Sequence, residues 1–338
     1  MTGLLDRLLD GARLSEAEAA ALLRRLADET TPPAVSGAVL AALRLRGVTA
    51  AELRGFARAM RELARRPAIA RDGCADVVGT GGDGSGSLNL STGTALLAAA
   101  CGVPVVKHGN RSISSRCGSA DVLEALGLPL PLDEEAAAAC LEETGFTFLF
   151  APHYHPAMRA IGPVRRALGV RTVFNILGPL TNPAAPAYHL IGAYDAKIAR
   201  LMAEALSGLP IARGFVVHGA AGWDEPTPIG PFLLFDVRPG KVEERRVDPL
   251  DLGVARCAPA DLAGGDAREN AVRLRAALRG EEGGAHLDAL VLGAGLVLEL
   301  TGREPDLGAG MERARAAVAD GAAARLLEAI ADFGRRVA

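Results

Sequence analysis

The sequence predicts an α/β protein with a small, mainly helical N-terminal domain and a larger α/β domain built on a mostly parallel central sheet. Apolar residues recur every three or four positions through residues 1–70, which is typical of amphipathic helices. From residue 75 onward, short apolar runs alternate with helical segments. Such alternation favours parallel strands with helices on both faces. At 338 residues, the chain is long enough for two domains.

The first 70 residues predict a helical bundle. Its apolar stripes lie in 4–9, 19–26, 35–43 and 53–63. Short breaks at Gly11, at Thr31-Pro32-Pro33 and at Gly47 separate the stripes, because glycine and proline interrupt helices. We therefore expect an N-terminal helical domain over 1–70 and an α/β domain over 71–338.

The α/β region predicts strands and helices in alternation. The expected strands are 75–78, 104–107, 146–150, 190–194, 214–217 and 232–236. The expected helices between them are 94–101, 119–126, 134–144 and 197–206. Further helices are expected at 268–278, 286–300 and 311–333.

A glycine-rich segment, 79–86, joins the first expected strand to the next helix, for which Ser91 or Thr92 is a natural N-cap. Glycines in such a turn let backbone N–H groups approach a phosphate. The segment matches neither the dinucleotide-binding nor the P-loop pattern. Asp83 within it could accept hydrogen bonds from ribose hydroxyls or hold the water of a cation. Glycines alone could be an ordinary turn, but the surrounding polar side chains favour phosphate binding.

The segment after the second expected strand is the most informative. Lys107-His108-Gly109-Asn110-Arg111 is followed by serines and by a helix that begins near Ser119. Free N–H groups and the dipole at a helix N-terminus favour an anion. We predict phosphate binding by Lys107, Ser115 and Ser119, with a second, smaller ligand alongside. A solvated strand end is the alternative for Lys107, and a structural role is the alternative for His108.

Composition excludes several classes of protein. The net charge of −3 argues against binding to a nucleic-acid backbone. The five cysteines are scattered without C-x-x-C spacing, so we expect reduced thiols in place of a zinc site or disulfides. The sequence has no apolar run of about 18 residues and no signal peptide, which predicts a cytoplasmic protein without a membrane partner.

The two polar loops together resemble those of the anthranilate phosphoribosyltransferase family. The resemblance extends over essentially the whole chain, through Phe150-Ala151-Pro152, His155-Pro156-Ala157-Met158, 163–165, 168–183, Val217-His218-Gly219, Asp224-Glu225 and Asn270-Ala271. It implies a fold of the nucleoside phosphorylase/phosphoribosyltransferase type, in which 155–186 packs back onto the N-terminal helices, and a homodimer formed through those helices. It also implies an enzyme of tryptophan biosynthesis that transfers the phosphoribosyl group of 5-phosphoribosyl 1-pyrophosphate (PRPP) to the amine of anthranilate.

The resemblance also implies a set of site residues. Those expected to bind PRPP are Gly79, Gly82, Asp83, Ser87, Asn89, Leu90, Ser91, Thr92, Lys107, His108, Gly109, Asn110, Arg111, Ser112, Ile113, Ser114, Ser115 and Ser119. Those expected to bind anthranilate are Gly79, His108, Asn110, Arg165, Gly178 and Pro179. Two Mg²⁺ ions per site are expected, held by Ser91, Asp224 and Glu225, with Glu225 bridging both.

Some of these residues also have ordinary explanations. Arg165 lies in a basic helix whose face could simply be solvated, as we expect for Arg166. However, a planar guanidinium is also a natural partner for a carboxylate. Asp224-Glu225 alone could be a solvated turn. No catalytic base is assigned, because an aromatic amine is a free base at neutral pH.

The chain departs from the family pattern around the acidic pair. It has Ala221-Gly222-Trp223 where the family usually has Asp-Gly-Leu, and Pro226-Thr227-Pro228 beyond. We expect changes in rate or substrate breadth but the same reaction. The alternatives are a phosphoribosyltransferase of this fold that uses another aromatic amine, and a non-catalytic nucleic-acid-binding relative. The intact acidic residues and the mildly acidic balance disfavour the latter.

Overall fold

The structure, a computed structural model, describes residues 2–70, 72–112 and 116–337. Ile113, Ser114 and Ser115, three of the expected PRPP ligands, lie outside the described residues.

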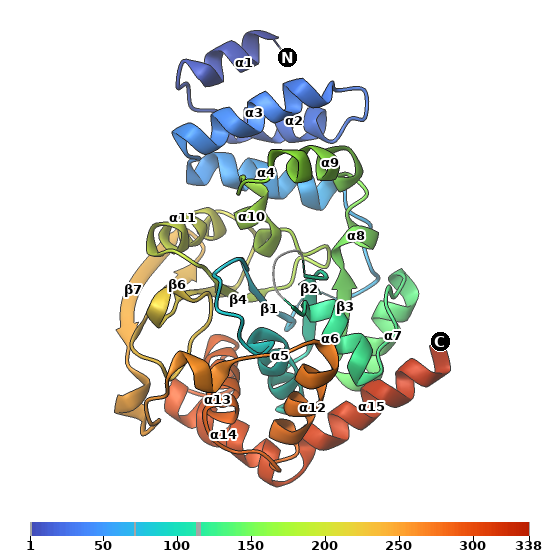
Figure 1. Cartoon of the computed structure of the whole chain (residues 1–338), viewed down its shortest axis with the longest axis vertical. Coiled ribbons are helices and arrows are strands. Elements are labelled where there is room, and N and C mark those ends of the chain that lie inside the picture. Colours follow the sequence, from blue (N-terminus) through green and yellow to red (C-terminus); the bar gives the residue numbers. More distant parts are fainter. Residues whose placement is uncertain (1, 71, 113–115, 338) are drawn as a thin grey trace.

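The chain begins with helices α1 (Thr2–Leu9), α2 (Glu16–Leu26), α3 (Pro33–Arg46) and α4 (Ala50–Glu62). Figure 1 shows them stacked at one end of the molecule. The sequence determines where α2 and α4 begin, because Ser15 and Thr49 each form a capping box with the glutamate three residues later. The apolar stripes of the four helices contribute to one buried cluster.

A seven-stranded sheet forms the centre of the molecule, in the order β3-β2-β1-β4-β5-β6-β7. Its strands are β1 (Ala75–Gly79), β2 (Val105–Gly109), β3 (Phe146–Phe150), β4 (Tyr188–Gly192), β5 (Arg213–His218), β6 (Phe232–Arg238) and β7 (Lys241–Val247). Strands β1 to β5 pair in parallel, and β6 and β7 extend the edge in antiparallel pairing. The mostly parallel sheet predicted from the sequence is therefore confirmed.

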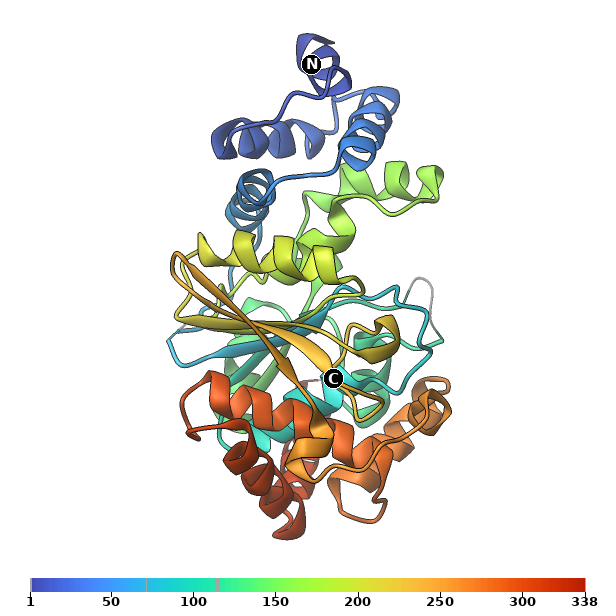
Figure 2. The same cartoon turned by 90° about the vertical axis from the view of Figure 1, so that its left-hand side faces the viewer.

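Helices cover both faces of the sheet (Figure 2). One face packs against α11 (Ala196–Ser207), which also contacts α4. The helices α5 (Leu90–Ala100), α6 (Ser119–Leu126), α7 (Glu134–Thr144), α12 (Ala267–Leu278), α13 (Ala285–Leu300), α14 (Leu307–Ala319) and α15 (Ala322–Val337) contribute buried residues to a second apolar cluster on the other side. No helix among the described residues is long and apolar enough to cross a membrane.

The segment between β3 and β4 returns to the N-terminal helices. It forms α8 (Ala151–Tyr154), α9 (Met158–Leu168), α10 (Phe174–Leu177) and a 3₁₀ turn, η1 (Gly178–Leu180). Helix α9 packs on α3 and α10 packs on α4, so their apolar residues share the cluster of the N-terminal helices. This return places α10 between the N-terminal helices and the central strands (Figure 1).

Four expectations about elements were wrong. Strand β4 begins at Tyr188, two residues before the predicted position, because Tyr188 pairs with Ala75 at the start of β1. The charged strand β7 was missed, since its residues are mostly exposed and carry little apolar signal. The predicted helix 311–333 is two helices, separated at Gly321, whose φ of +78° interrupts helical geometry.

The fourth error concerns the start of α5. This helix begins at Leu90, so Ser91 and Thr92 lie in its first turn and neither is the N-cap. Asn89 occupies the N-cap position without a side-chain capping bond. The Ser91 N–H instead donates to the carboxylate of Glu225 at 3.1 Å. A distant acid thus satisfies an N–H that a capping side chain would otherwise bind.

Candidate active site

Most of the described residues that are expected to bind PRPP and Mg²⁺ lie at the carboxyl ends of the parallel strands. The glycine-rich loop follows β1, the Lys107–Arg111 segment ends β2, and the Asp224-Glu225 pair follows β5. Ligands of open α/β sheets bind at this edge. Helix α5 begins beside the same edge, so its first-turn N–H groups also face the site.

The glycine-rich loop depends on backbone that other residues rarely adopt. Gly81 and Gly82 have φ values of +66° and +71°. At Gly79 a Cβ atom would lie 2.4 Å from Oδ2 of Asp224, so only glycine allows this approach. Within the loop, Asp83 Oδ1 accepts bonds from the N–H and hydroxyl of Ser85 at 3.0 and 2.9 Å. The loop is therefore folded around Asp83.

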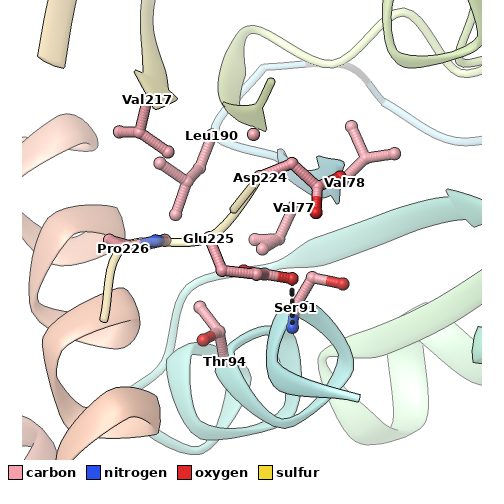
Figure 3. A pocket seen from close by; sticks show the side chains of 10 residues that line it. Val77, Val78, Ser91, Thr94, Leu190, Val217, Asp224, Glu225 and Pro226 are labelled. Atoms are coloured by element: carbon pink, nitrogen blue, oxygen red, sulfur yellow. Dashed lines mark hydrogen bonds between the residues drawn. The ribbon is translucent and has the colours of Figure 1, made fainter. Parts of the chain in front are cut away.

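The acidic pair connects this loop to α5. Asp224 Oδ2 accepts a bond from the Gly81 N–H at 2.6 Å and one from the Thr80 hydroxyl at 3.3 Å. The Asp224 N–H donates to Asp83 Oδ2 at 3.3 Å. Figure 3 shows the side chains of Asp224 and Glu225 leaving one loop in different directions, with Glu225 directed toward Ser91. A solvated turn is excluded, since Asp224 is only 7% exposed.

The acids are close enough to destabilise one another's charges. Burial raises the pKa of Asp224, and the neighbouring Asp83 raises it further. Burial likewise raises the pKa of Glu225, with repulsion from Asp224 adding to the shift. Both shifts reflect buried negative charge that is incompletely compensated by the protein.

These residues suit Mg²⁺. They line a cavity of about 10 Å³, room for about one water or ion, whose walls are Val77, Val78, Ser91, Thr94, Leu190, Gly192, Val217, Asp224, Glu225 and Pro226 (Figure 3). The described residues contain no group of three or more His, Cys, Asp or Glu residues arranged for a metal. Two carboxylates and the Ser91 hydroxyl nevertheless fit Mg²⁺, which prefers few protein ligands completed by phosphate oxygens and water.

Lys107 contacts two residues of the cavity wall, Val77 and Ser91, and is 2% exposed, which excludes a solvated strand end. Its ammonium donates to the backbone oxygen of Val77 and, at 3.3 Å, to the Ser91 hydroxyl. Burial lowers the pKa of Lys107, while the negative charges of Asp76, Glu225 and Asp224 raise it. The lysine therefore partly compensates the acidic cluster.

Of the residues expected to bind anthranilate, the structure brings His108 against η1, where it hydrogen-bonds the backbone of Gly178. The rings of His108 and His155 meet edge to face with centroids 5.0 Å apart. Burial lowers the pKa of His108 well below its usual value, and His155 lowers it further, so the imidazole is neutral at pH 7. The Asn110 carbonyl accepts bonds from the Ser119 hydroxyl at 3.1 Å and the Ala120 N–H at 3.3 Å, which joins β2 to α6.

Arg165 differs from its neighbours in α9. Its guanidinium lies 5.3 Å from the centre of the Phe174 ring, and burial lowers its pKa. Among the described residues, no acid pairs with it. Arg166 is exposed, as expected. Arg165 is thus a half-buried cation with an aromatic neighbour and no anion.

Arg111 is engaged in the structure. Its guanidinium pairs with Asp121 at 2.9 Å and with Glu124 at 2.5 and 2.6 Å, and it lies 5.6 Å from the Phe150 ring. These bonds connect the loop after β2 to α6. Arg111 therefore supports this loop, and a phosphate would have to compete with two acids for it.

Sequence reasoning missed three residues of the site. Arg171 donates to the Gly82 carbonyl and stacks 4.0 Å from the centre of the Tyr194 ring. Asp76 and Asn182 form a buried pair beneath the site, at 2.9 Å. Asn182 lies in the segment 168–183 that carries the family resemblance, but no local pattern identified its partner.

The fold and the site together define a glycosyltransferase with a helical-bundle domain and an α/β domain. The helical-bundle domain of the glycosyl transferase family matches residues 2–64, and its a/b domain matches residues 71–324. At the next level of detail, the chain belongs to the anthranilate phosphoribosyltransferase family.

The relatives support this assignment along the full length. The chain is 47% identical to the anthranilate phosphoribosyltransferase of Rubrobacter xylanophilus, over 99% of this chain and 97% of the relative. The Thermus thermophilus enzyme structure is 45% identical, with a TM-score of 0.92 over 98% of this chain and 99% of that chain. The Saccharomyces cerevisiae enzyme in complex with PRPP and Mg is 25% identical, with a TM-score of 0.89 over 98% and 97% of the two chains.

Proposed function

We propose that this chain transfers the phosphoribosyl group of PRPP to the amine of anthranilate and releases pyrophosphate, in the pathway to tryptophan. The main support from the site is the distribution of its charged residues. A cluster of Asp83, Asp224 and Glu225, in which Asp224 is buried, faces the glycine-rich loop, while Arg165 lies in α9 beside Phe174 with no acid paired to it among the described residues. The first group suits a pyrophosphate bound with Mg²⁺, and the second suits an aromatic carboxylate.

The glycine-rich loop and the start of α5 form the PRPP site in this proposal. Backbone N–H groups of the loop bind phosphate oxygens, together with side chains of Asn89, Ser91, Thr92 and Lys107 and the segment that ends at Ser119. Mg²⁺ supplies positive charge against the departing pyrophosphate, and we propose two ions, held by Ser91, Asp224 and Glu225. The yeast relative solved with PRPP and Mg supports this use of the ion.

Anthranilate would bind between the loop after β2 and η1. Arg165 binds its carboxylate through a charge-assisted pair, and Gly178 and Pro179 shape the wall for the ring. Gly79, His108 and Asn110 complete the pocket. The yeast relative was also solved in complex with 4-fluoroanthranilate, a ring-substituted analogue.

Catalysis in this site is a matter of positioning and charge. The amine of anthranilate attacks C1 of the ribose as the C1–pyrophosphate bond breaks, and the amine proton is lost to solvent afterwards. The residues hold both substrates in line and exclude water from C1, which supplies much of the rate. The neutral His108 fits this scheme, since an amine that is already a free base needs no strong general base.

The assembly and location are also proposals. We propose a homodimer through the N-terminal helices, supported by the family resemblance and by exposed Leu9 and Leu45, at 64% and 90%. We propose a cytoplasmic enzyme, on the ground that its relatives catalyse a biosynthetic reaction between soluble metabolites.

The direct test is fluorescence-monitored consumption of anthranilate with PRPP and Mg²⁺. We expect turnover that requires both PRPP and the metal. Ring-substituted aminobenzoates run in parallel distinguish a related enzyme that prefers another amine. Filter binding of single-stranded DNA at moderate salt tests the nucleic-acid alternative, and retention of DNA without turnover would overturn the proposal.

A further inference from the structure

The central sheet has an interrupted ladder between β1 and β2. Strands β1 and β4 pair at five positions, as do β2 and β3. Among the described residues, β1 and β2 pair only at Ala75 and Val105, near their amino ends. The two strands remain neighbours in the sheet, but their backbone ladder is interrupted toward the carboxyl ends, where the glycine-rich loop and the loop after β2 begin.

Side chains form hydrogen bonds with the backbone groups that have no partner on the neighbouring strand where the ladder is interrupted. The His108 N–H donates to Asp76 Oδ1 at 3.1 Å. The Val106 carbonyl accepts from Asn182 Nδ2 at 2.8 Å, and the Val77 carbonyl accepts from the Lys107 ammonium. Buried backbone groups require partners, so these bonds replace the missing ladder.

Asp76 and Asn182 connect these bonds to one another. Asn182 Nδ2 donates to Asp76 Oδ2 at 2.9 Å, and both residues are fully buried. A carboxylate in this position is unfavourable unless it is well paired. A continuous backbone ladder would have satisfied the same strands without burying a charge. The carboxylate of Asp76 also offsets the buried charge of Lys107, so the pair does more than replace the backbone ladder.

The pair joins three segments of the site. Asp76 lies three residues before Gly79 on the strand that leads to the phosphate loop. Its bond to His108 fixes β2 where the expected anthranilate residues begin. Asn182 lies two residues beyond η1, whose first two residues are Gly178 and Pro179. One buried bond thus links the phosphate side to both parts of the anthranilate pocket.

We propose that Asp76 and Asn182 are positioning residues that set the separation between the PRPP loop and the anthranilate pocket. The inference rests on the proposed function. Neither residue contacts substrate, and each acts through the backbone it holds. A misplacement of about 1 Å between reacting groups can lower a rate by about a hundredfold. Changes at the pair should therefore lower kcat more than they weaken binding of either substrate alone.

The test compares Asp76→Asn, Asn182→Asp and the exchanged pair, which carries both substitutions. We expect each single variant to lower kcat by about 10- to 100-fold, while the affinity for PRPP with Mg²⁺, measured by calorimetry, changes by less than about threefold. In the exchanged pair, an amide at position 76 can donate to a carboxylate at position 182, which restores the bond between the two side chains in the reverse direction, whereas the bond to the Val106 carbonyl is lost in Asn182→Asp and in the exchanged pair alike. We expect the exchanged pair to have a kcat at least about fivefold higher than that of the less active single variant. Two substitutions that damage the structure independently do not give such a coupling.

Thr147→Val provides the matched control, because Thr147 is a fully buried polar residue on β3 outside the interrupted ladder. It should leave kcat within about twofold. Should Asp76→Asn not fold, Asn182→Ala, which keeps the Asp76 bond to His108, carries the same test.

The outcomes separate this inference from the proposed function. An inactive wild-type protein would overturn the proposed function itself. An active wild type with near-normal kcat in both single variants would overturn the positioning role. Equal losses in kcat and in PRPP affinity, without recovery in the exchanged pair, would show a purely structural role and overturn it as well.

Discussion

Arg165 is half-buried beside Phe174 and has no acid among the described residues. Since burial lowers the pKa of its guanidinium, a ligand carboxylate would restore favourable surroundings for the charge. We expect Arg165→Ala to lower kcat/KM for anthranilate by about ten- to a hundredfold, the value of a charge-assisted hydrogen bond, with a smaller effect on KM for PRPP. Steady-state kinetics with each substrate varied in turn measures both effects.

Arg166→Ala is the control for this prediction. Arg166 is the next residue in α9 and is exposed, so its removal changes the charge by the same amount outside the pocket. We expect near-normal kinetics. Equal losses for anthranilate and PRPP in Arg165→Ala would remove Arg165 from the anthranilate site.

His155 gives a prediction about stability and pH. Burial lowers its pKa to about 4 from an ordinary 6.5. The unfolded chain therefore takes up a proton between pH 6.5 and 4 while the folded protein does not, so stability is complete above pH 6.5 and falls as the pH is lowered. The shift corresponds to at most about 3 kcal/mol.

Urea unfolding of wild type and His155→Gln across this pH range measures the effect. The difference between the two unfolding free energies should shrink as the pH falls, because only the wild type loses this contribution. Parallel pH profiles for the two proteins would contradict the assignment of a depressed pKa to His155.

At the scale of elements, the two acids in the loop after β5 allow the proposed Mg²⁺ binding to be tested. Glu225→Gln should reduce kcat/KM by about a thousandfold, and Asp224→Asn should reduce it less, since metal stabilisation of charge amounts to several kcal/mol. A carboxylate shared by two ions loses interactions with both when it is neutralised. Measurements of kcat/KM across a magnesium titration should show only partial recovery of Glu225→Gln at high Mg²⁺.

Trp223→Leu is the control in the same loop. Trp223 is buried in the apolar cluster, and leucine is the usual family residue, so metal dependence should be unchanged. Near-full activity of both acid variants at every magnesium concentration would show that the acidic pair does not hold metal.

Helices and strands with a strong apolar periodicity were predicted well. Their boundaries were predicted wrongly where residues distant in the sequence determine them. The helix 119–126 and the strand 146–150 were predicted to the residue. The start of α5 was wrong because Glu225, 134 residues away, binds the Ser91 N–H. The strand β7 was missed because an edge strand exposed to solvent has no need of apolar alternation.

The site was predictable only where a residue carries chemistry in a recognisable motif. Lys107, Asp224 and Glu225 stand in such motifs. The two acids line one cavity, and Lys107 bonds to Ser91 in the wall of that cavity. Asp76 and Asn182 stand in no such motif, because a buried pair 106 residues apart leaves no local pattern. Arg171 lies beyond the end of α9 and binds the Gly82 carbonyl, 89 residues away in the sequence, so no local pattern indicates this contact.

At the scale of the whole molecule, the N-terminal helices and one face of the sheet share an apolar cluster. It extends from Leu8 in α1 through α4 and α11 to Phe235 in β6. The opposite face has its own cluster with the C-terminal helices. The helical domain is therefore attached to the sheet by packed side chains. The segment from α9 to η1 is part of this packed connection. Arg165 therefore belongs to the helical domain, whereas the glycine-rich loop belongs to the sheet.

The attachment leaves apolar surface on the outer helices. Leu45 of α3 is 90% exposed and Leu9 of α1 is 64% exposed. Covering such residues with a second copy would remove apolar area from water. We expect light scattering to show a dimer at micromolar concentration, and Leu45→Glu to shift it toward monomer. Val272→Glu is the matched control, since Val272 is 62% exposed on α12 among the C-terminal helices.

A wild-type monomer under these conditions would contradict the dimer. Dissociation by Val272→Glu, with Leu45→Glu still dimeric, would place the interface elsewhere. The two variants also separate assembly from chemistry. Every proposed ligand of PRPP, anthranilate and Mg²⁺ comes from a single chain, so a monomeric Leu45→Glu protein should keep kcat/KM within about threefold of the wild type. A larger loss would mean that the partner subunit holds the helical domain, and with it Arg165, in the geometry that the reaction needs.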